Sequence, residues 1–231
     1  MSEVEMPKIQ VHKDGAVAIV TLNDDAWSED MQRDLLSTIQ RLMDDDEDVR
    51  AIVLTGADGR FCTGITGART AAGARLVRAM WTGAKPVIAA VEGGCTGAGL
   101  SLVAACDMAY GARDSHYACT FVQHGLMPAL GLIWTLPQKV GAGKARELML
   151  RGIGFDAEEA ARMGLLAAVC EPGQAAAVAL RQAQQLAQLP PVTLMLLKGA
   201  MVNAMNSIHS AARHEIDLAP VVRGVTFSGR V

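Results

Sequence analysis

The sequence predicts one α/β domain with a helical C-terminal region, and three observations support this. Residues 51–55 (AIVLT) and 87–91 (VIAAV) are continuous apolar runs, typical of strands buried on both faces. A glycine-rich loop, a helical pattern and further strand patterns follow the second run, which is the alternation of an α/β layer. After Ile133 helical patterns dominate, with no linker rich in Gly, Pro or Ser. We expect a single domain over 1–231, with an α/β core over 1–140 and helices over 141–231.

The N-terminal elements follow from turn and capping chemistry. Two extended runs, 9–11 and 16–22, flank an Asp-Gly pair, which favours a β-hairpin. Apolar residues then recur at three- and four-residue spacing after Ser28, which predicts a serine-capped amphipathic helix ending near Met43. The acidic run 44–48 should be a solvated loop, because carboxylates are unfavourable at a helix C-terminus.

The elements after residue 70 are predicted from the spacing of their apolar residues and from their capping residues. Patterns predict a helix over 71–81, a short apolar helix over 100–105 and strands over 107–110 and 117–121. Helices are then expected over 145–150, 156–163, 174–189, 191–201 and 205–218. Asp156 fits an N-cap, with Glu159 completing a capping box, and Pro191 fits the first turn of its helix.

Composition excludes several classes of protein. The 21 Lys and Arg against 24 Asp and Glu give a net charge of −3, so no basic footprint for nucleic acid is present. No uninterrupted apolar run is long enough for a membrane span, and the N-terminus lacks the apolar region of a secretory signal. Five irregularly spaced cysteines argue against a disulfide framework or a zinc site. We expect buried thiols in a cytoplasmic protein.

Five segments in a fixed order carry a resemblance to a known family. They are AIVLTG (51–56), RFCTG (60–64), KPVIAAVEGGCTGAGLSLVAACDMAYG (85–111), FVQHGLMPALGLIWTLPQKVG (121–141) and GFDAEEAARMGLLAAV (154–169). In this order they resemble the crotonase, or enoyl-CoA hydratase/isomerase, superfamily. The resemblance implies a crotonase-like ββα spiral core with a helical C-terminal region. It also implies a homotrimer or hexamer.

The resemblance further implies a pocket for an acyl-CoA or acyl-carrier thioester, with no cofactor beyond the coenzyme A or phosphopantetheine of the substrate. Two backbone N–H groups of such a pocket bind the thioester oxygen and stabilise an enolate; by resemblance they belong to Ile65 and Ala98. An enolate oxyanion needs preorganised donors in a dry site, and a helix N-terminus supplies a free N–H and a positive dipole end.

The sequence departs from the family pattern at its carboxylates. The two glutamates of hydratases align with Ser101 and with Gly125 or close to it, and the aspartate of isomerases aligns with Ala129. Hydration requires an acid and a base, which serine, glycine and alanine do not supply near neutral pH. His124 is a candidate acid/base group because its ordinary pKa suits the task, and Ser101 is a candidate for orienting a water. Glu92 in the glycine loop is interpreted as a turn-stabilising residue.

The expected substrate-binding positions lie in the matched motifs. By resemblance they are Ala26, Phe61, Gly64, Thr66, Gly97, Gly125 and Ala129. The CoA-contacting loop over 22–28 is acidic rather than basic, so phosphate binding would depend on Arg69, Arg75, Arg78 or Lys85, which are otherwise solvated helix charges. Two hypotheses remain open: an enzyme that stabilises a thioester enolate in a hydration, isomerisation or decarboxylation, and a catalytically inactive binding or assembly module.

Overall fold

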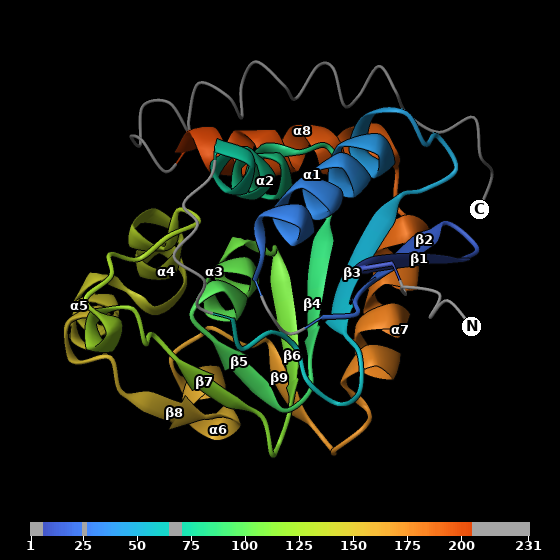
Figure 1. Ribbon diagram of the computed structural model, residues 1–231. Coiled ribbons are helices and arrows are strands. Elements are labelled where there is room, and N and C mark those ends of the chain that lie inside the picture. Colours follow the sequence, from blue (N-terminus) through green and yellow to red (C-terminus); the bar gives the residue numbers. More distant parts are fainter. Residues whose placement is uncertain (1–6, 25–26, 65–70, 205–231) are drawn as a thin grey trace, which may run out of the picture.

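The computed structural model describes residues 7–24, 27–64 and 71–204, which form a layered α/β fold (Figure 1). Its larger sheet has the order β1-β2-β3-β4-β6-β9, with β1 antiparallel to β2 and all other neighbours parallel. The strands are β1 (Ile9–Asp14), β2 (Val17–Leu22), β3 (Ala51–Gly56), β4 (Val87–Val91), β6 (Met108–Ala112) and β9 (Ala168–Cys170). Strands β3 and β4 are buried along their length except for Gly56. This burial on both faces explains why their sequences are continuously apolar.

A second, smaller sheet follows the end of β4. It contains β5 (Gly94–Thr96), β7 (His116–Ala118) and β8 (Gly154–Asp156), with β5 parallel and β8 antiparallel to β7. Because β5 lies within the glycine-rich loop, the second sheet fixes that loop to β7.

Helices cover both faces of the larger sheet (Figure 1). Their bounds are α1 (Glu29–Asp44), α2 (Ala71–Thr82), α3 (Ala98–Ala105), α4 (Leu132–Val140), α5 (Ala142–Arg151), α6 (Ala157–Arg162), α7 (Ala175–Ala187) and α8 (Pro191–Ala204), with a 3₁₀ turn η1 (Val122–His124). On one face, α7 presents buried alanines at four-residue intervals, Ala175, Ala179, Ala183 and Ala187, which pack against the sheet. On the other face, α1, α2 and α3 enclose the larger hydrophobic core.

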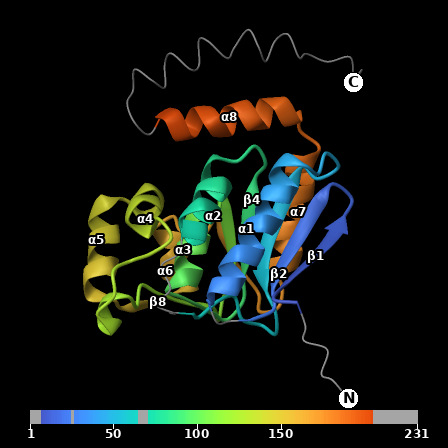
Figure 2. The same ribbon diagram turned by 45° about the horizontal axis from the view of Figure 1, so that its top comes forward.

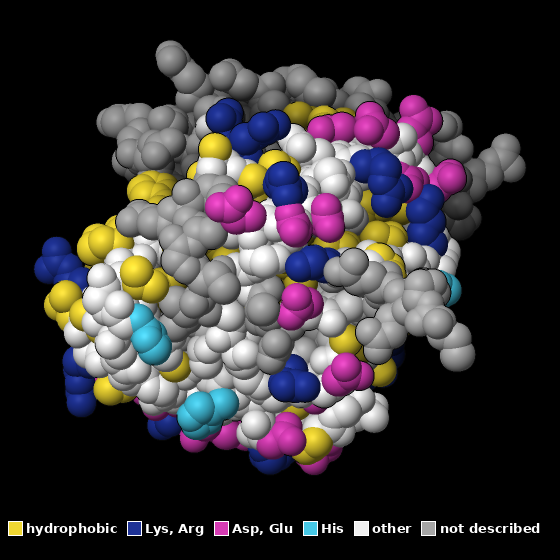
Figure 3. All heavy atoms as spheres, in the orientation of Figure 1, with side chains coloured by type: hydrophobic (Ala, Val, Ile, Leu, Met, Phe, Trp, Pro, Cys, Tyr) yellow, Lys and Arg dark blue, Asp and Glu magenta, His cyan; other side chains and the backbone are white. Residues whose placement is uncertain are grey.

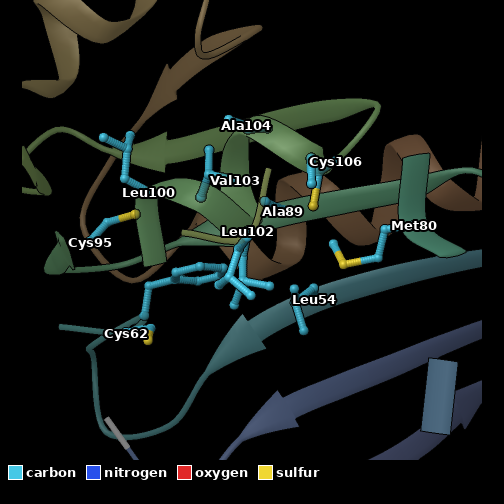
Figure 4. Packing of buried hydrophobic residues seen from close by; sticks show 14 of the residues in the cluster. Leu54, Cys62, Met80, Ala89, Cys95, Leu100, Leu102, Val103, Ala104 and Cys106 are labelled. Carbon is cyan, nitrogen blue, oxygen red and sulfur yellow. The ribbon is translucent and has the colours of Figure 1, made fainter. Parts of the chain in front are cut away.

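The short helix α3 runs through the centre of this core. All eight of its residues are buried, and Figure 4 shows Leu102 and Val103 packed among side chains that include Leu54 of β3 and Met80 of α2. A helix that is apolar all round belongs in the interior of a protein. The core therefore fixes the position of the helix that begins directly after the glycine loop.

The expected N-caps and the hairpin turn are confirmed, whereas the side chain of Glu159, expected to complete a capping box, pairs with Lys144. Ser28 Oγ accepts a hydrogen bond from Met31 N at 3.2 Å, and α1 ends at Asp44, next to the predicted Met43. Asp156 Oδ1 accepts from Glu159 N at 2.7 Å. Gly15 has φ +56°, as the turn of the hairpin requires.

Three expectations differ from the structure. The strand expected over 117–121 ends at Ala118, because Phe121 is already helical and opens η1. The strands β8 and β9 interrupt the region expected to be helical after residue 140, and at three residues each they are too short to show a period. Helix α4 was not predicted; it contains Pro137 and starts at a glycine without a side-chain cap. The helix expected over 205–218 lies outside the described residues.

The prediction of buried thiols is confirmed for all five cysteines, which are free. None of the helices in the described ranges combines the length and apolar character that a bilayer-spanning segment requires.

We expect the protein to lose stability in alkaline solution because of these thiols. Burial raises the pKa of Cys95 well above its ordinary 9.0, that of Cys106 to about 12 and that of Cys119 to about 11. Below pH 8 the folded and unfolded chains both keep these protons. Above about pH 9 only the unfolded chain releases them, so the free energy of unfolding should fall by about 4 kcal/mol in total between pH 7 and pH 10.

Urea unfolding at pH 7, 8, 9 and 10 measures this loss. The lowered pKa values of Lys85 and Lys139 act in the opposite direction, but they concern two groups against three thiols. The variant with Cys106→Ala and Cys119→Ala should retain about a third of the thiol-dependent pH effect. An equally steep decline in that variant would show that other groups cause the alkaline loss.

Candidate functional site

The two motifs that carry the resemblance lie side by side in the structure. Gly94 O accepts hydrogen bonds from Phe61 N and Cys62 N, both at 3.2 Å, and Thr96 N donates to Cys62 O at 3.0 Å. Cys62 and Cys95 form an isolated parallel β-bridge. Main-chain hydrogen bonds therefore hold the segment 61–64 along the glycine loop and the start of α3.

Two glycines make this close approach possible. A Cβ atom at Gly99 would lie 2.2 Å from Cys62 O, so only glycine allows α3 to contact the neighbouring segment at this point. Gly97 precedes α3 with φ +56°, a backbone conformation that glycine adopts without strain. The loop therefore makes a tight strand-to-helix turn, and the same geometry places the Ala98 N–H at a helix N-terminus.

The Ala98 N–H has a partner within the protein. It donates to Gly64 O at 3.2 Å, so the group expected to bind a thioester oxygen is occupied by a main-chain carbonyl. The other expected donor, Ile65, lies outside the described residues, as do Ala26 and Thr66. For Ala98 to bind a substrate carbonyl, that oxygen has to replace Gly64 O at the N–H.

The polar side chains expected near this loop are not brought together. Ser101 is fully buried, and its hydroxyl donates to Gly97 O at 3.2 Å within its own helix, the arrangement of a helix-packing serine. His124 is exposed on η1, where the neighbouring Gln123 donates to Gly152 O. Gly125 is exposed with φ +67° and ends η1. Ala129 is half-buried.

Glu92 has the stabilising role that the sequence interpretation gave it, but on a distant helix. Its Oε2 accepts from Gly173 N at 3.0 Å and its Oε1 from Ala175 N at 2.8 Å. These are donors at the N-terminus of α7, where main-chain N–H groups lack helical partners and negative charge is favourable. Glu92 therefore ties the start of the glycine loop to α7, and its oxygens are engaged in that contact.

A small cavity lies beside the first motif. Its volume is about 120 Å³, and Phe61, which is buried, forms part of its wall at the ends of β2 and β3. Its charged lining consists of Asp24, Asp58 and Arg60, which sum to one negative charge. Ligands of α/β sheets bind at the carboxyl ends of the strands, but this charge is unfavourable for the phosphates of a nucleotide.

The basic residues considered for phosphate binding are dispersed. Lys85 Nζ donates to Leu42 O at 2.5 Å and Asp46 O at 2.6 Å beyond the end of α1, so it is committed to a structural contact. Arg75 and Arg78 are exposed on α2, and Arg69 lies outside the described residues. Figure 3 shows basic and acidic side chains interspersed over the visible face. Within the described ranges no group of three or more His, Cys, Asp or Glu side chains is arranged to hold a metal ion.

The sequence interpretation passed over one polar group close to the loop. Ala118 O accepts from Gly97 N at 3.1 Å, which holds the end of β7 against the residue before Ala98. Two residues later, the Thr120 hydroxyl is buried without a hydrogen-bond partner. A lone threonine in an apolar segment gives no sequence signal for such a group.

Comparisons with known proteins identify the family of the chain. The family model for enoyl-CoA hydratase/isomerase matches residues 12–219. "Probable enoyl-CoA hydratase echA14" of Mycobacterium tuberculosis is 37% identical over 183 residues, covering 72% of this chain and 71% of the relative. The 1,2-epoxyphenylacetyl-CoA isomerase of Escherichia coli is 31% identical over 219 residues, covering 86% of this chain and 83% of that one.

Solved structures show the same fold. The crystal structure of an enoyl-CoA hydratase from Polaromonas sp. JS666 superposes with a TM-score of 0.86 at 28% identity, covering 95% of this chain and 92% of that one. The adjoining motifs at 60–64 and 92–99 and the match over 12–219 lead to one conclusion: the chain belongs to the enoyl-CoA hydratase/isomerase family.

Proposed function

We propose that the protein binds an acyl thioester of coenzyme A or of a phosphopantetheine arm and stabilises its enolate at the N-terminus of α3. The observation that carries this proposal is the main-chain ladder that joins 61–64 to the glycine loop and sets the Ala98 N–H at the start of a buried helix. The thioester oxygen takes this N–H over from Gly64 O. By resemblance, Ile65 supplies the second donor.

The side chains around the loop favour a reaction with little acid/base demand. Ser101 is bonded within its helix, Glu92 caps α7, and positions 125 and 129 are glycine and alanine. Decarboxylation fits these groups best among the three reaction types. The electrons of the broken C–C bond pass into the enolate, CO₂ leaves, and the α-carbon then takes a proton from water. The oxyanion donors stabilise the charge that develops.

The net charge of the cavity beside Phe61 indicates which part of the thioester carrier the protein recognises. One net negative charge in the neighbouring cavity and the engaged Lys85 support recognition of the pantetheine arm rather than of the nucleotide. No cofactor besides the carrier of the substrate is required. The free, buried cysteines support a reducing compartment, for which we propose the cytoplasm.

We also propose a homotrimer or hexamer. Ile133, Trp134 and Leu150 on α4 and α5 expose 55%, 48% and 75% of their surface, which favours a protein contact at this end of the molecule.

The competing function is a catalytically inactive binding or assembly module. The hydrogen bond from Ala98 N to Gly64 O favours it, because a donor satisfied within the protein need not bind a substrate. The two functions differ in whether a thioester displaces that carbonyl.

Incubation with malonyl-CoA, methylmalonyl-CoA and crotonyl-CoA, and with the matching pantetheine thioesters, separates the two functions. We expect CO₂ release from the malonyl-type thioesters to exceed hydration of crotonyl-CoA, and each pantetheine thioester to have a KM similar to that of its CoA counterpart. Absence of turnover, together with the absence of any thioester-dependent rise in Tm, would leave only the module.

A further inference from the structure

A second cavity, of about 290 Å³, lies at the opposite end of the larger sheet from the glycine loop. Pro86 and Asp107, which directly precede β4 and β6, form part of its wall, whereas the glycine loop follows the end of β4. Helix α8 crosses this end of the fold (Figure 2). The cavity is therefore separate from the proposed thioester site, and α3, about 12 Å long, spans the distance between them.

One wall of the cavity is apolar. Leu186 of α7 and four residues of α8, Leu194, Leu197, Met201 and Val202, contribute to it. Leu197 and Met201 expose 54% and 58% of their surface. An aliphatic chain lying along α8 would remove part of this apolar surface from water, which is favourable.

The charged side chains that line the cavity carry a net positive charge. They are Asp107, Lys139 and Lys198, which sum to one positive charge. Lys198 Nζ is fully engaged, since it donates to Asp107 Oδ2 at 2.7 Å and to two main-chain carbonyls. Within the described part of the chain Lys139 Nζ makes one hydrogen bond, to Asp107 O at 2.8 Å, although an ammonium group carries three donors. The excess charge is therefore that of Lys139.

A second donor in the lining is unpaired. Trp81 Nε1 is buried and has no hydrogen-bond partner among the described residues, and the Lys139 Nζ lies 5.8 Å from the centroid of the Trp81 ring. Burial lowers the pKa of Lys139, which reflects the cost of holding its charge in an apolar place. An anion that accepted from both groups would offset that cost and satisfy the indole N–H.

We propose that this cavity binds a small aliphatic carboxylate, with its carboxylate at Lys139 Nζ and Trp81 Nε1 and its chain along the apolar wall. A monoanion matches the single excess charge. The volume lies at the lower limit of small-molecule sites, which favours a medium-chain rather than a long-chain acid. The site does not depend on turnover at the glycine loop, so the inference holds for the enzyme and for the inactive module alike.

Isothermal titration calorimetry with octanoate tests this site. We expect saturable binding to the full chain, at least tenfold weaker binding to Lys139→Met and weaker binding to Trp81→Phe, because each variant removes one of the two donors. Lys144→Met is the matched control, since it removes the same charge from α5, where Lys144 pairs with Glu147 and Glu159 outside the cavity. This control should bind octanoate as the parent protein does. 1-Octanol, which has the chain without the charge, should bind more weakly than octanoate.

Competition separates this inference from the proposed function. Saturating crotonyl-CoA should leave octanoate binding unchanged if the two sites are distinct, whether or not the thioester is turned over. The inference is overturned by an absence of saturation at about 10 mM octanoate, by equal affinity of Lys139→Met and the parent protein, or by displacement with crotonyl-CoA. It is also overturned if octanoate does not bind and Leu197→Lys dissociates an oligomer, since the cavity would then face a second copy of the chain.

Discussion

Replacing Ala98 with proline is expected to lower the turnover of an accepted thioester by about two to three orders of magnitude, the usual effect of losing one oxyanion donor. Proline removes the N–H that is now bonded to Gly64 O and that we assign to the substrate carbonyl. Ala98 is the first residue of α3, a position where helices accept proline, so the fold should persist. Steady-state kinetics with the best thioester and a thermal melt of each variant measure the two effects.

The matched variant is Ala98→Gly, which keeps the N–H and removes only the methyl group. It should retain turnover within about an order of magnitude of the parent enzyme, because the donor on which the oxyanion depends is unchanged. If Ala98→Pro and Ala98→Gly both retained the turnover of the parent enzyme, the Ala98 N–H would have no part in the mechanism. A loss in both variants, with an unchanged Tm, would mean that the methyl group rather than the donor matters.

The elements that position the site were predictable because their signals are local. The apolar runs of β3 and β4 are nearly continuous because these strands are buried, and Ser28 and Asp156 cap the helices that directly follow them. Three-residue strands such as β8 lack enough residues to show a period. They form because a partner strand is already in place.

The state of the candidate site was less predictable because it depends on contacts across the fold. The hydrogen-bond partners of Glu92, Gly173 N and Ala175 N, lie 81 and 83 residues away in the sequence. No local sequence pattern predicts that a loop carboxylate will cap a helix so much later in the chain. The sequence predicted a short helix over 100–105, and by resemblance it placed the Ala98 N–H at the start of that helix. It did not predict that Gly64 O would occupy this N–H, because that depends on the orientation of one peptide group.

Helix α8 also depends on a contact across the fold, made by the buried cation of Lys198. Lys198 donates to Met80 O and Lys85 O, both at 2.9 Å, and to Asp107 Oδ2, at 2.7 Å. Its side chain is 9% exposed. Asp107 Oδ2 also accepts from Val87 N at 2.7 Å, so one carboxylate joins α8 to the start of β4. The contact links residues 91 positions apart and closes the end of the sheet opposite to the glycine loop.

Lys198→Met is therefore expected to lower the free energy of unfolding by about 3–5 kcal/mol, because it leaves a partly buried carboxylate and two carbonyls without their donor. For a chain of this length the Tm should fall by roughly 10 °C. Urea unfolding and calorimetry measure both quantities. Lys13→Met provides the surface control, since the Lys13–Asp46 pair is solvent-exposed on the lysine side and its loss should cost far less than that of Lys198.

A double-mutant cycle assigns the loss to the ion pair. In Asp107→Asn the carboxylate charge is absent, so adding Lys198→Met should cost less than it does in the parent protein, with a coupling of about 1–3 kcal/mol. Additive losses would show that Lys198 stabilises α8 through its hydrogen bonds to Met80 O and Lys85 O and the packing of its aliphatic stem rather than through the ion pair. Because α8 and the Asp107 carboxylate also form the wall of the second cavity, a strong coupling would mean that the ion pair holds that wall in place before any ligand arrives.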